Sequence, residues 1–302
     1  MSTLQVKKLH TITGHRDAIY TLEGADQPGV FFSAAGDGMV VRWDLGDPEN
    51  GEVVAKLPNS VYALHHQDAR QVLVVGHNYE GIHFLDWKNK TETGSLQLTK
   101  SAIFDIKGYD GRILVASGEG FVRLVDVENR IVIAKNQGTD KPARTIAVNK
   151  NNGDIAVGYS DHFIRVFDGN LTMKTEWKAH DNSVFTLRYL PGSDFLMSGS
   201  RDARLKVWDT GAAYVQAGQV VAHMYAINHI EFSADGKHFV TCSMDKSIKV
   251  WDTEALRLLK VIDKARHAGH GTSVNKLLWT TYNNQLLSAS DDRTISVWHI
   301  IF

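Results

Sequence analysis

The sequence predicts an all-β protein built from seven copies of one repeat, and two residue patterns carry that prediction. The first is a segment that ends in Trp-Asp or a related pair, and its copies end near residues 44, 86, 126, 168, 209, 252 and 299. The second is a four-residue motif, apolar-x-x-apolar, that opens each copy, from Ile19–Leu22 in the first to Val274–Leu277 in the last. Two independent patterns that keep one register over 302 residues indicate a repeat architecture.

Each copy contains four short strands. Runs such as VFTLRYL (184–190), DFLMSGS (194–200) and RLKVWD (204–209) are rich in β-branched and aromatic residues, and Gly, Asp, Asn and Ser separate them. No stretch has a helical period, and all five prolines fit connections or strand starts. Seven copies of four strands predict a seven-bladed β-propeller, whose blades pack face to face and need apolar residues on both sides.

The copies differ in how fully they keep the pattern. Copies one, five, six and seven have a His before the apolar-x-x-apolar motif and a Ser or Thr in the second strand. They also have a turn Asp and, six residues after this Asp, a Trp. Copies two, three and four have Leu85, Val125 and Phe167 at the Trp position and match in spacing and apolar pattern. The seventh copy ends after its third strand, whereas residues 4–12 form an apolar segment that belongs to no copy.

The Gly-His or Ala-His, turn Asp and Trp-Asp pattern resembles the WD-repeat propeller family over essentially the whole chain. The resemblance implies one propeller domain over residues 1–302, with blades ending near the seven positions given above. It also implies that residues 4–12 complete blade 7 as its outer strand and pair with the strand at 293–299. Such pairing hides sheet edges that would otherwise template aggregation.

The resemblance further implies a structural tetrad in each well-kept copy, in which hydrogen bonds run from an indole N–H through a hydroxyl and an imidazole to a carboxylate. His, Ser and Asp are also the residue types of a nucleophilic triad. However, the set recurs in one chain and each set is tied to a Trp, so we expect no catalytic residues. The expected tetrads are His15, Ser33, Asp37 and Trp43; His180, Ser198, Asp202 and Trp208; His223, Thr241, Asp245 and Trp251; and His270, Ser288, Asp292 and Trp298.

The resemblance also implies that partners bind at the mouth of the central channel, on the top face, and that two positions in each blade point toward it. One follows the first apolar residue of the inner strand, and it is Tyr20, Tyr62, Phe104, Arg144, Phe185, Asn228 and Asn275 in blades 1 to 7. The other precedes the turn Asp, and it is Gly36, Asn78, Gly118, Ser160, Arg201, Met244 and Asp291. Within these sets the expected partner-binding residues are Tyr20, Tyr62, Phe104, Arg144, Phe185, Arg201, Asn228, Met244, Asn275 and Asp291.

Aromatic residues and Arg are enriched in binding hot spots, which favours a protein or peptide ligand at this mouth. Arg144 and Arg201, on either side of Phe185, are suited to a carboxylate or phosphate on the bound segment. The alternative is that the aromatic side chains only fill the channel and pack against each other.

Composition excludes several other classes of protein. With 33 Lys and Arg against 34 Asp and Glu, the net charge of −1 gives no footprint for nucleic acid or an anionic membrane. The single cysteine, Cys242, excludes a disulfide framework and a multi-cysteine metal site, and His65–His66 and His267-x-x-His270 are too sparse for metal binding. We therefore expect no metal and no cofactor. No apolar run has the length of a signal peptide or a membrane span, so we expect a soluble, cytoplasmic protein.

The sequence as a whole favours a non-catalytic scaffold for protein–protein interaction that binds its partner at the top face. A closed ring without free sheet edges is expected to be a monomer by itself. The alternative is a propeller enzyme or small-ligand binder that uses the central channel, with Asp105, Asp291 and the two arginines as its candidate groups.

Overall fold

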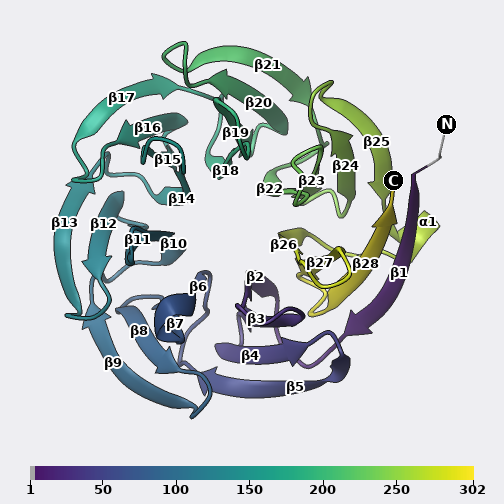
Figure 1. Cartoon of the computed structure of the whole chain (residues 1–302), viewed down its shortest axis with the longest axis horizontal. Helices are drawn as coiled ribbons and strands as arrows, with labels where there is room; N and C mark the ends of the chain where they lie inside the picture. Colours follow the sequence, from purple (N-terminus) through teal and green to yellow (C-terminus); the bar gives the residue numbers. More distant parts are fainter. Residues whose placement is uncertain (1–3) are drawn as a thin grey trace.

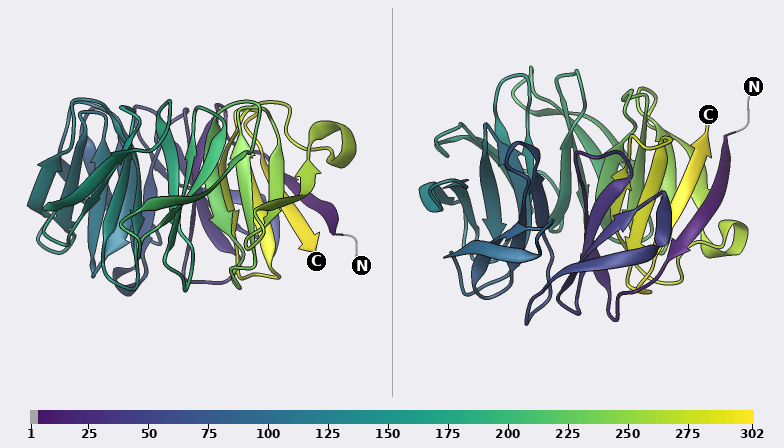
Figure 2. Two further views of the ribbon diagram at one scale, coloured as in Figure 1. Left: turned by 90° about the horizontal axis from the view of Figure 1, so that it is seen from above. Right: turned by 60° about the horizontal axis from the view of Figure 1, so that its bottom comes forward.

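The computed structural model describes residues 4–302 and shows a ring of blades around a central channel (Figure 1). Over these residues the chain forms seven antiparallel sheets of four strands, one short helix and one 3-10 turn. Seen from the side, the ring is a short cylinder with loops at both ends (Figure 2). The predicted seven-bladed propeller is confirmed.

Blades 1 to 6 each use four consecutive strands, ordered from the channel to the rim, and blade 7 borrows its outermost strand from the start of the chain. Blades 1 to 3 comprise β2 (Ile19–Gly24), β3 (Val30–Ala35), β4 (Met39–Asp44), β5 (Asp47–Lys56), β6 (Leu64–Gln67), β7 (Val72–His77), β8 (Gly81–Asp86), β9 (Thr91–Gln97), β10 (Ile103–Tyr109), β11 (Arg112–Ser117), β12 (Phe121–Asp126) and β13 (Ile131–Gln137), with the 3-10 turn at Asp68–Arg70. Blades 4 to 7 comprise β14 (Ala143–Val148), β15 (Ile155–Tyr159), β16 (Phe163–Phe167), β17 (Met173–Lys178), β18 (Val184–Tyr189), β19 (Phe195–Ser200), β20 (Arg204–Asp209), β21 (Val215–Val221), β22 (Ile227–Phe232), β23 (His238–Ser243), β24 (Ile248–Asp252), β25 (Arg257–Ile262), β26 (Val274–Trp279), β27 (Gln285–Ser290), β28 (Ile295–Ile301) and β1 (Gln5–Ile12).

The core lies between neighbouring blades. Strands β3 and β27 are buried along their whole length because another blade covers each face of their sheet. Each apolar cluster joins two adjacent blades; one of them brings Phe31 and Trp43 of blade 1 against Leu287 and Val297 of blade 7. Outer strands such as β13 alternate between exposed and half-buried residues. This distribution explains why the second and third strands of each repeat are the most apolar.

Strand β1 closes the ring. It pairs antiparallel with β28 from Gln5 opposite Ile301 to Ile12 opposite Ile295, with an irregularity between Lys8 and His10. The predicted pairing of the N-terminal segment with blade 7 is confirmed, and it extends two residues past the expected end of the partner strand.

The connection before β26 forms the short helix α1 (Lys264–His267), which lies on the outside of the ring beside β1 (Figures 1 and 2). Lys8 Nζ on β1 donates a hydrogen bond of 2.8 Å to the carbonyl of Ala268, just after this helix. Among the described residues, no helix has the length and apolar character needed to cross a membrane.

Candidate functional site

Four hydrogen-bonded tetrads hold the turns at one end of the ring, the end with the connections between second and third strands, which we call the top face. In blade 5 the indole N–H of Trp208 donates to Ser198 Oγ at 2.9 Å, and Ser198 Oγ lies 2.7 Å from His180 Nε2. His180 Nδ1 lies 2.9 Å from Asp202. The same chain of contacts, with a Thr241 hydroxyl in blade 6, joins the residues expected in blades 1, 6 and 7.

The tetrad groups are inaccessible to substrates, and each polar group has a hydrogen-bond partner. Ser198 is fully buried, so its hydroxyl has no access to a reactant. Burial lowers the pKa of His180 by more than Asp202 raises it. Burial raises the pKa of Asp202, but the hydrogen bond and charge of His180 outweigh it and hold that pKa well below its usual value. A neutral imidazole between a hydroxyl and a carboxylate satisfies buried polar groups and fixes the turn.

Blades 3 and 4 replace the tetrad with ionic networks that sequence reasoning missed. In blade 3 the guanidinium of Arg123 donates to Ser117 Oγ at 2.8 Å and pairs with Glu119 at 3.2 Å. In blade 4 Arg165 pairs with Asp161 at 2.9 Å and with Glu176 at 2.8 Å. The signal was available, because both arginines stand three residues before the Asp or equivalent that ends the copy.

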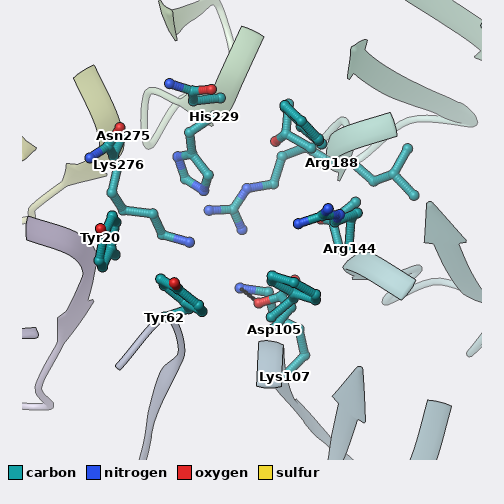
Figure 3. A pocket seen from close by; sticks show the side chains of 15 residues that line it. Tyr20, Tyr62, Asp105, Lys107, Arg144, Arg188, His229, Asn275 and Lys276 are labelled. Carbon is teal, nitrogen blue, oxygen red and sulfur yellow. Dashed lines mark ion pairs between the residues drawn. The ribbon is translucent and has the colours of Figure 1, made fainter. Parts of the chain in front are cut away.

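The channel mouth is built by one residue from each blade. In six blades the strand register shifts immediately after the first residue of the inner strand, so that the next residue is left out of the ladder. Such a bulge re-aims the side chain of the extra residue, here into the channel. In blade 2 the inner strand starts only at Leu64, and Tyr62 precedes it. All seven residues of the first expected set line one cavity of about 320 Å³ (Figure 3): Tyr20, Tyr62, Phe104, Arg144, Phe185, Asn228 and Asn275.

The aromatic side chains of the mouth form a continuous shelf. The rings of Tyr20 and Tyr62 meet edge to face at 4.7 Å between centroids, and Tyr62 stacks on Phe104 at 5.9 Å. The guanidinium of Arg144 lies 4.1 Å from the ring centre of Phe104 and 5.6 Å from that of Phe185. The shelf is therefore preformed, and Arg144 is held above it.

The second expected set is divided by the structure. Asn78 is buried and accepts a hydrogen bond from the backbone N–H of Ile103 at 3.1 Å, and Ser160 accepts one from Arg144 Nε at 2.8 Å. Arg201, Met244 and Asp291 are exposed and lie outside the lining of the cavity. Gly36 and Gly118 stand at the same turn position in blades 1 and 3. The structure thus separates the mouth residues from an outer ring of turn residues.

Sequence reasoning missed the cations below the mouth. Lys107, Arg188 and Lys276 line the same cavity, and Figure 3 shows Arg144, Arg188 and Lys276 pointing toward its centre. Lys107 pairs with Asp105 at 3.4 Å and Arg188 pairs with Glu231, whereas within residues 4–302 neither Arg144 nor Lys276 makes an ion pair.

These unpaired cations are destabilised by their surroundings. Burial and the charges of Lys107 and Arg188 lower the pKa of Lys276 to about 8, against the opposing effects of Asp105 and Glu23. Burial also lowers the pKa of Arg144, and Arg201 acts in the same direction. An anionic group in the cavity would relieve both effects.

Asp105 connects two blades. Its carboxylate accepts hydrogen bonds from the backbone N–H groups of Ile106 at 3.1 Å and of Ile146, in the next blade, at 2.8 Å. With Lys107 as a third partner, this carboxylate is held by the protein itself. Asp291, the other acid of the enzyme alternative, accepts from Asn275 Nδ2 at 2.7 Å outside the cavity lining. The two acids therefore do not converge on one reaction centre.

About half of the chain matches a known repeat family. The family model described as "WD domain, G-beta repeat" matches residues 6–44, 171–209, 216–252 and 263–299, about half of the chain. An uncharacterized WD repeat-containing protein of Schizosaccharomyces pombe is 24% identical over 98% of the chain and 49% of its own length. WD repeat-containing protein 1-B of Xenopus laevis is 22% identical over 98% of the chain and 49% of its own length. The chain spans about half the length of these curated relatives.

A solved structure shares the whole fold. The WD40 β-propeller domain of Doa1 superposes with a TM-score of 0.87 at 16% sequence identity, and the match covers 97% of each chain. The matched segments of the family model coincide with the four copies that carry tetrads. Blades 2 and 3 and most of blade 4 lie outside the matched segments and resemble the family in their fold and in the spacing of their repeats.

Proposed function

The chain belongs to the WD40-repeat family, and from that premise we propose that it is a non-catalytic scaffold that binds a segment of a partner protein across the channel mouth at its top face. Membership of this family implies a platform whose partners usually bind at the mouth of the propeller. Seven blades packed on one another hold the mouth residues at fixed positions, which limits the entropy lost on binding. The partner contacts are assigned to Tyr20, Tyr62, Phe104, Arg144, Phe185, Asn228 and Asn275, with Arg201, Met244 and Asp291 at the rim.

The observation that carries the proposal is the position of Arg144. Its guanidinium lies on the Phe104 ring, is half-buried and has no carboxylate partner within residues 4–302. Its Nε is used by Ser160, which leaves the two terminal nitrogens for a ligand. A guanidinium with its terminal nitrogens free recognises a carboxylate or phosphate in a bidentate geometry. The segment that fits this mouth carries an acidic or phosphorylated side chain beside an apolar one that packs on the aromatic shelf.

The alternative of an enzyme or small-ligand binder uses the same cavity differently. Lys107, Arg188 and Lys276 would then hold a small anion below the shelf, without contact from a protein at the rim. This alternative gains from the 320 Å³ volume, which accommodates a small molecule. It loses from the engagement of Asp105 with two backbone amides, because a general base needs a free lone pair directed at its substrate.

The test is selection of a random peptide library, including phosphorylated members, on the immobilised chain. Synthetic copies of the selected peptides are then titrated by fluorescence polarisation against wild type, Phe104→Ala and Arg144→Gln. Arg112→Gln is the matched control, because it removes the same charge from an exposed residue at the far end of blade 3. Each variant is first shown by circular dichroism and melting to keep the native fold.

We expect peptides with acidic and apolar positions whose affinity falls about 30-fold or more in both mouth variants, the loss typical of a hot spot, and is unchanged in Arg112→Gln. Peptides that bind all four proteins equally would contradict a binding site at the mouth. Failure to select any peptide, together with a melting shift caused by a small polyanion, would favour the small-ligand alternative.

A further inference from the structure

Blade 2 lacks both the tetrad and the arginine network, and in their place two imidazoles and a carboxylate meet. His77 is the last residue of β7, Glu80 lies in the turn, and His83 lies in the middle of β8, three residues before Asp86. Tyr79 has a φ of 73°, and this left-handed residue turns the chain so that Glu80 faces the two rings. The three side chains therefore come from one hairpin at the top face.

The three polar atoms form a compact triangle. His77 Nδ1 lies 3.0 Å from Glu80 Oε2 and 3.3 Å from His83 Nε2, and the third side, from His83 Nε2 to Glu80 Oε2, is 3.6 Å. A zinc ion with tetrahedral ligands at about 2.0–2.1 Å separates those ligands by about 3.3 Å. The triangle thus has the dimensions of one face of a zinc tetrahedron.

The outer nitrogens of both rings are already held by neighbouring side chains. His83 Nδ1 lies 3.1 Å from Glu92 Oε1 on β9. A carboxylate at that nitrogen holds its proton there and leaves the lone pair on Nε2, which faces His77 and Glu80. Asn59 Nδ2 lies 3.4 Å from His77 Nε2, and a half-turn of this amide would place its oxygen there to accept a proton from Nε2. Metal-ligating histidines characteristically have such second partners.

Charge balance distinguishes blade 2 from its neighbours. Blade 3 places Arg123 against Glu119, and blade 4 places Arg165 against Asp161 and Glu176. At the same strand position blade 2 has His83, beside Glu80 and Glu92. Within residues 4–302 these two carboxylates contact imidazoles alone among the basic groups. Blade 2 therefore lacks the guanidinium that the other two blades place against their carboxylates.

We infer that His77, Glu80 and His83 bind one zinc ion, with Glu92 and Asn59 orienting the two imidazoles. The ion takes the place that Arg123 and Arg165 occupy in blades 3 and 4, and it fixes the turn between β7 and β8. Glu80 is 58% exposed, so its side leads to solvent and a water molecule completes the tetrahedron. The site departs from the expectation of no metal, which considered only histidines close together in the sequence.

The test uses the whole chain, freed of metal by a chelator and returned to chelator-free buffer. Zinc binding is measured by isothermal titration and by metal content after gel filtration, and cobalt(II) absorption reports the coordination geometry. The variants are Glu80→Gln, Glu92→Gln and His83→Arg, which copies the cation of blade 3. Glu128→Gln is the control, since this exposed carboxylate pairs with Arg70 on another surface.

We expect one zinc per chain, a tetrahedral cobalt(II) spectrum and a melting temperature that zinc raises. Glu80→Gln should lose most of the affinity, Glu92→Gln about 10- to 100-fold, as is typical of partners of a ligating histidine, and Glu128→Gln none. His83→Arg should be folded without metal and insensitive to zinc. The inference would be overturned if the folded wild type took up no zinc, or if Glu80→Gln and His83→Arg took up as much zinc as the wild type.

Discussion

The hydroxyl of Thr241 is the best place to measure what a tetrad contributes to stability. This residue is fully buried on β23, accepts from Trp251 Nε1 at 2.9 Å and lies 2.7 Å from His223 Nε2. Thr241→Val keeps the volume and removes the hydroxyl. Thr241→Ser removes one methyl group and keeps the hydroxyl, as in the other three tetrads. The two substitutions therefore separate hydrogen bonding from packing at one site.

The expected magnitudes differ clearly. Thr241→Val leaves the indole N–H and an imidazole nitrogen without partners, and each buried group so orphaned costs about 1–3 kcal/mol. The sum is about 2–6 kcal/mol of unfolding free energy. Thr241→Ser leaves a methyl-sized gap, which costs about 0.5–1.5 kcal/mol. For a chain of this size 1 kcal/mol lowers Tm by roughly 2–4 °C, so the valine variant should melt well below the serine variant.

The assay is thermal melting and urea unfolding of wild type and both variants at neutral pH, with near-ultraviolet circular dichroism as the check on native packing. Only the valine variant takes the acceptor from the Trp251 indole, which is one of seven tryptophans that contribute to this spectrum. Equal losses in Thr241→Val and Thr241→Ser would refute the reasoning, since packing alone would then account for the site.

The buried imidazoles, strand β1 and the Arg123 network each make a measurable contribution to the stability of the ring. Burial lowers the pKa values of His180 and His223 below the ordinary value of 6.5, so the unfolded chain binds protons that the native chain does not. The free energy of unfolding should therefore fall as the pH drops from about 7 to about 5. A Tm independent of pH in this window would contradict neutral tetrad imidazoles. A chain that starts at residue 13 lacks β1 and exposes the edge of β28. Light scattering should then show aggregation, and Tm should fall. An unchanged Tm would show that β1 does not hold the ring closed. Arg123→Met removes the hydrogen bond to Ser117 and the ion pair with Glu119, although Glu119 keeps its contacts with Thr99 and the backbone N–H of Lys100. Because Glu119 is also partly solvated, we expect a cost of about 1–3 kcal/mol, with faster amide exchange confined to blade 3. Unaltered exchange there would assign the network no structural role.

Local residue patterns were sufficient to predict most of the fold. Strand alternation, turn residues and the seven-fold spacing are properties of short segments, and they identified every blade. The family resemblance placed the orphan segment at 4–12 correctly, as the fourth strand of a blade that otherwise has three. The start of the inner strand in blade 2 was not predictable in the same way, because the apolar-x-x-apolar motif begins at Val61, whereas β6 begins at Leu64.

The candidate site was predictable only in part. The family resemblance pointed to the seven residues that line the mouth, but nothing in the local pattern indicated that a bulge aims six of them inward. Lys107, Arg188 and Lys276 were missed because each looks like an ordinary solvated cation in its own strand. His77, Glu80 and His83 were missed because they are separated by turn residues, and only the hairpin brings their polar atoms within 3.6 Å of each other.

The repeat, the number of blades and the tetrad residues can be recognised from the chain alone, because each follows from a spacing that recurs about every forty residues. Which charges share the channel depends on the folded ring, because those charges come from blades far apart in the sequence and meet when the ring closes. Ring closure is a property of how seven sheets pack, and it sets distances that no single repeat encodes. The electrostatics of the mouth and the imidazole–carboxylate cluster of blade 2 therefore became visible in the folded molecule alone.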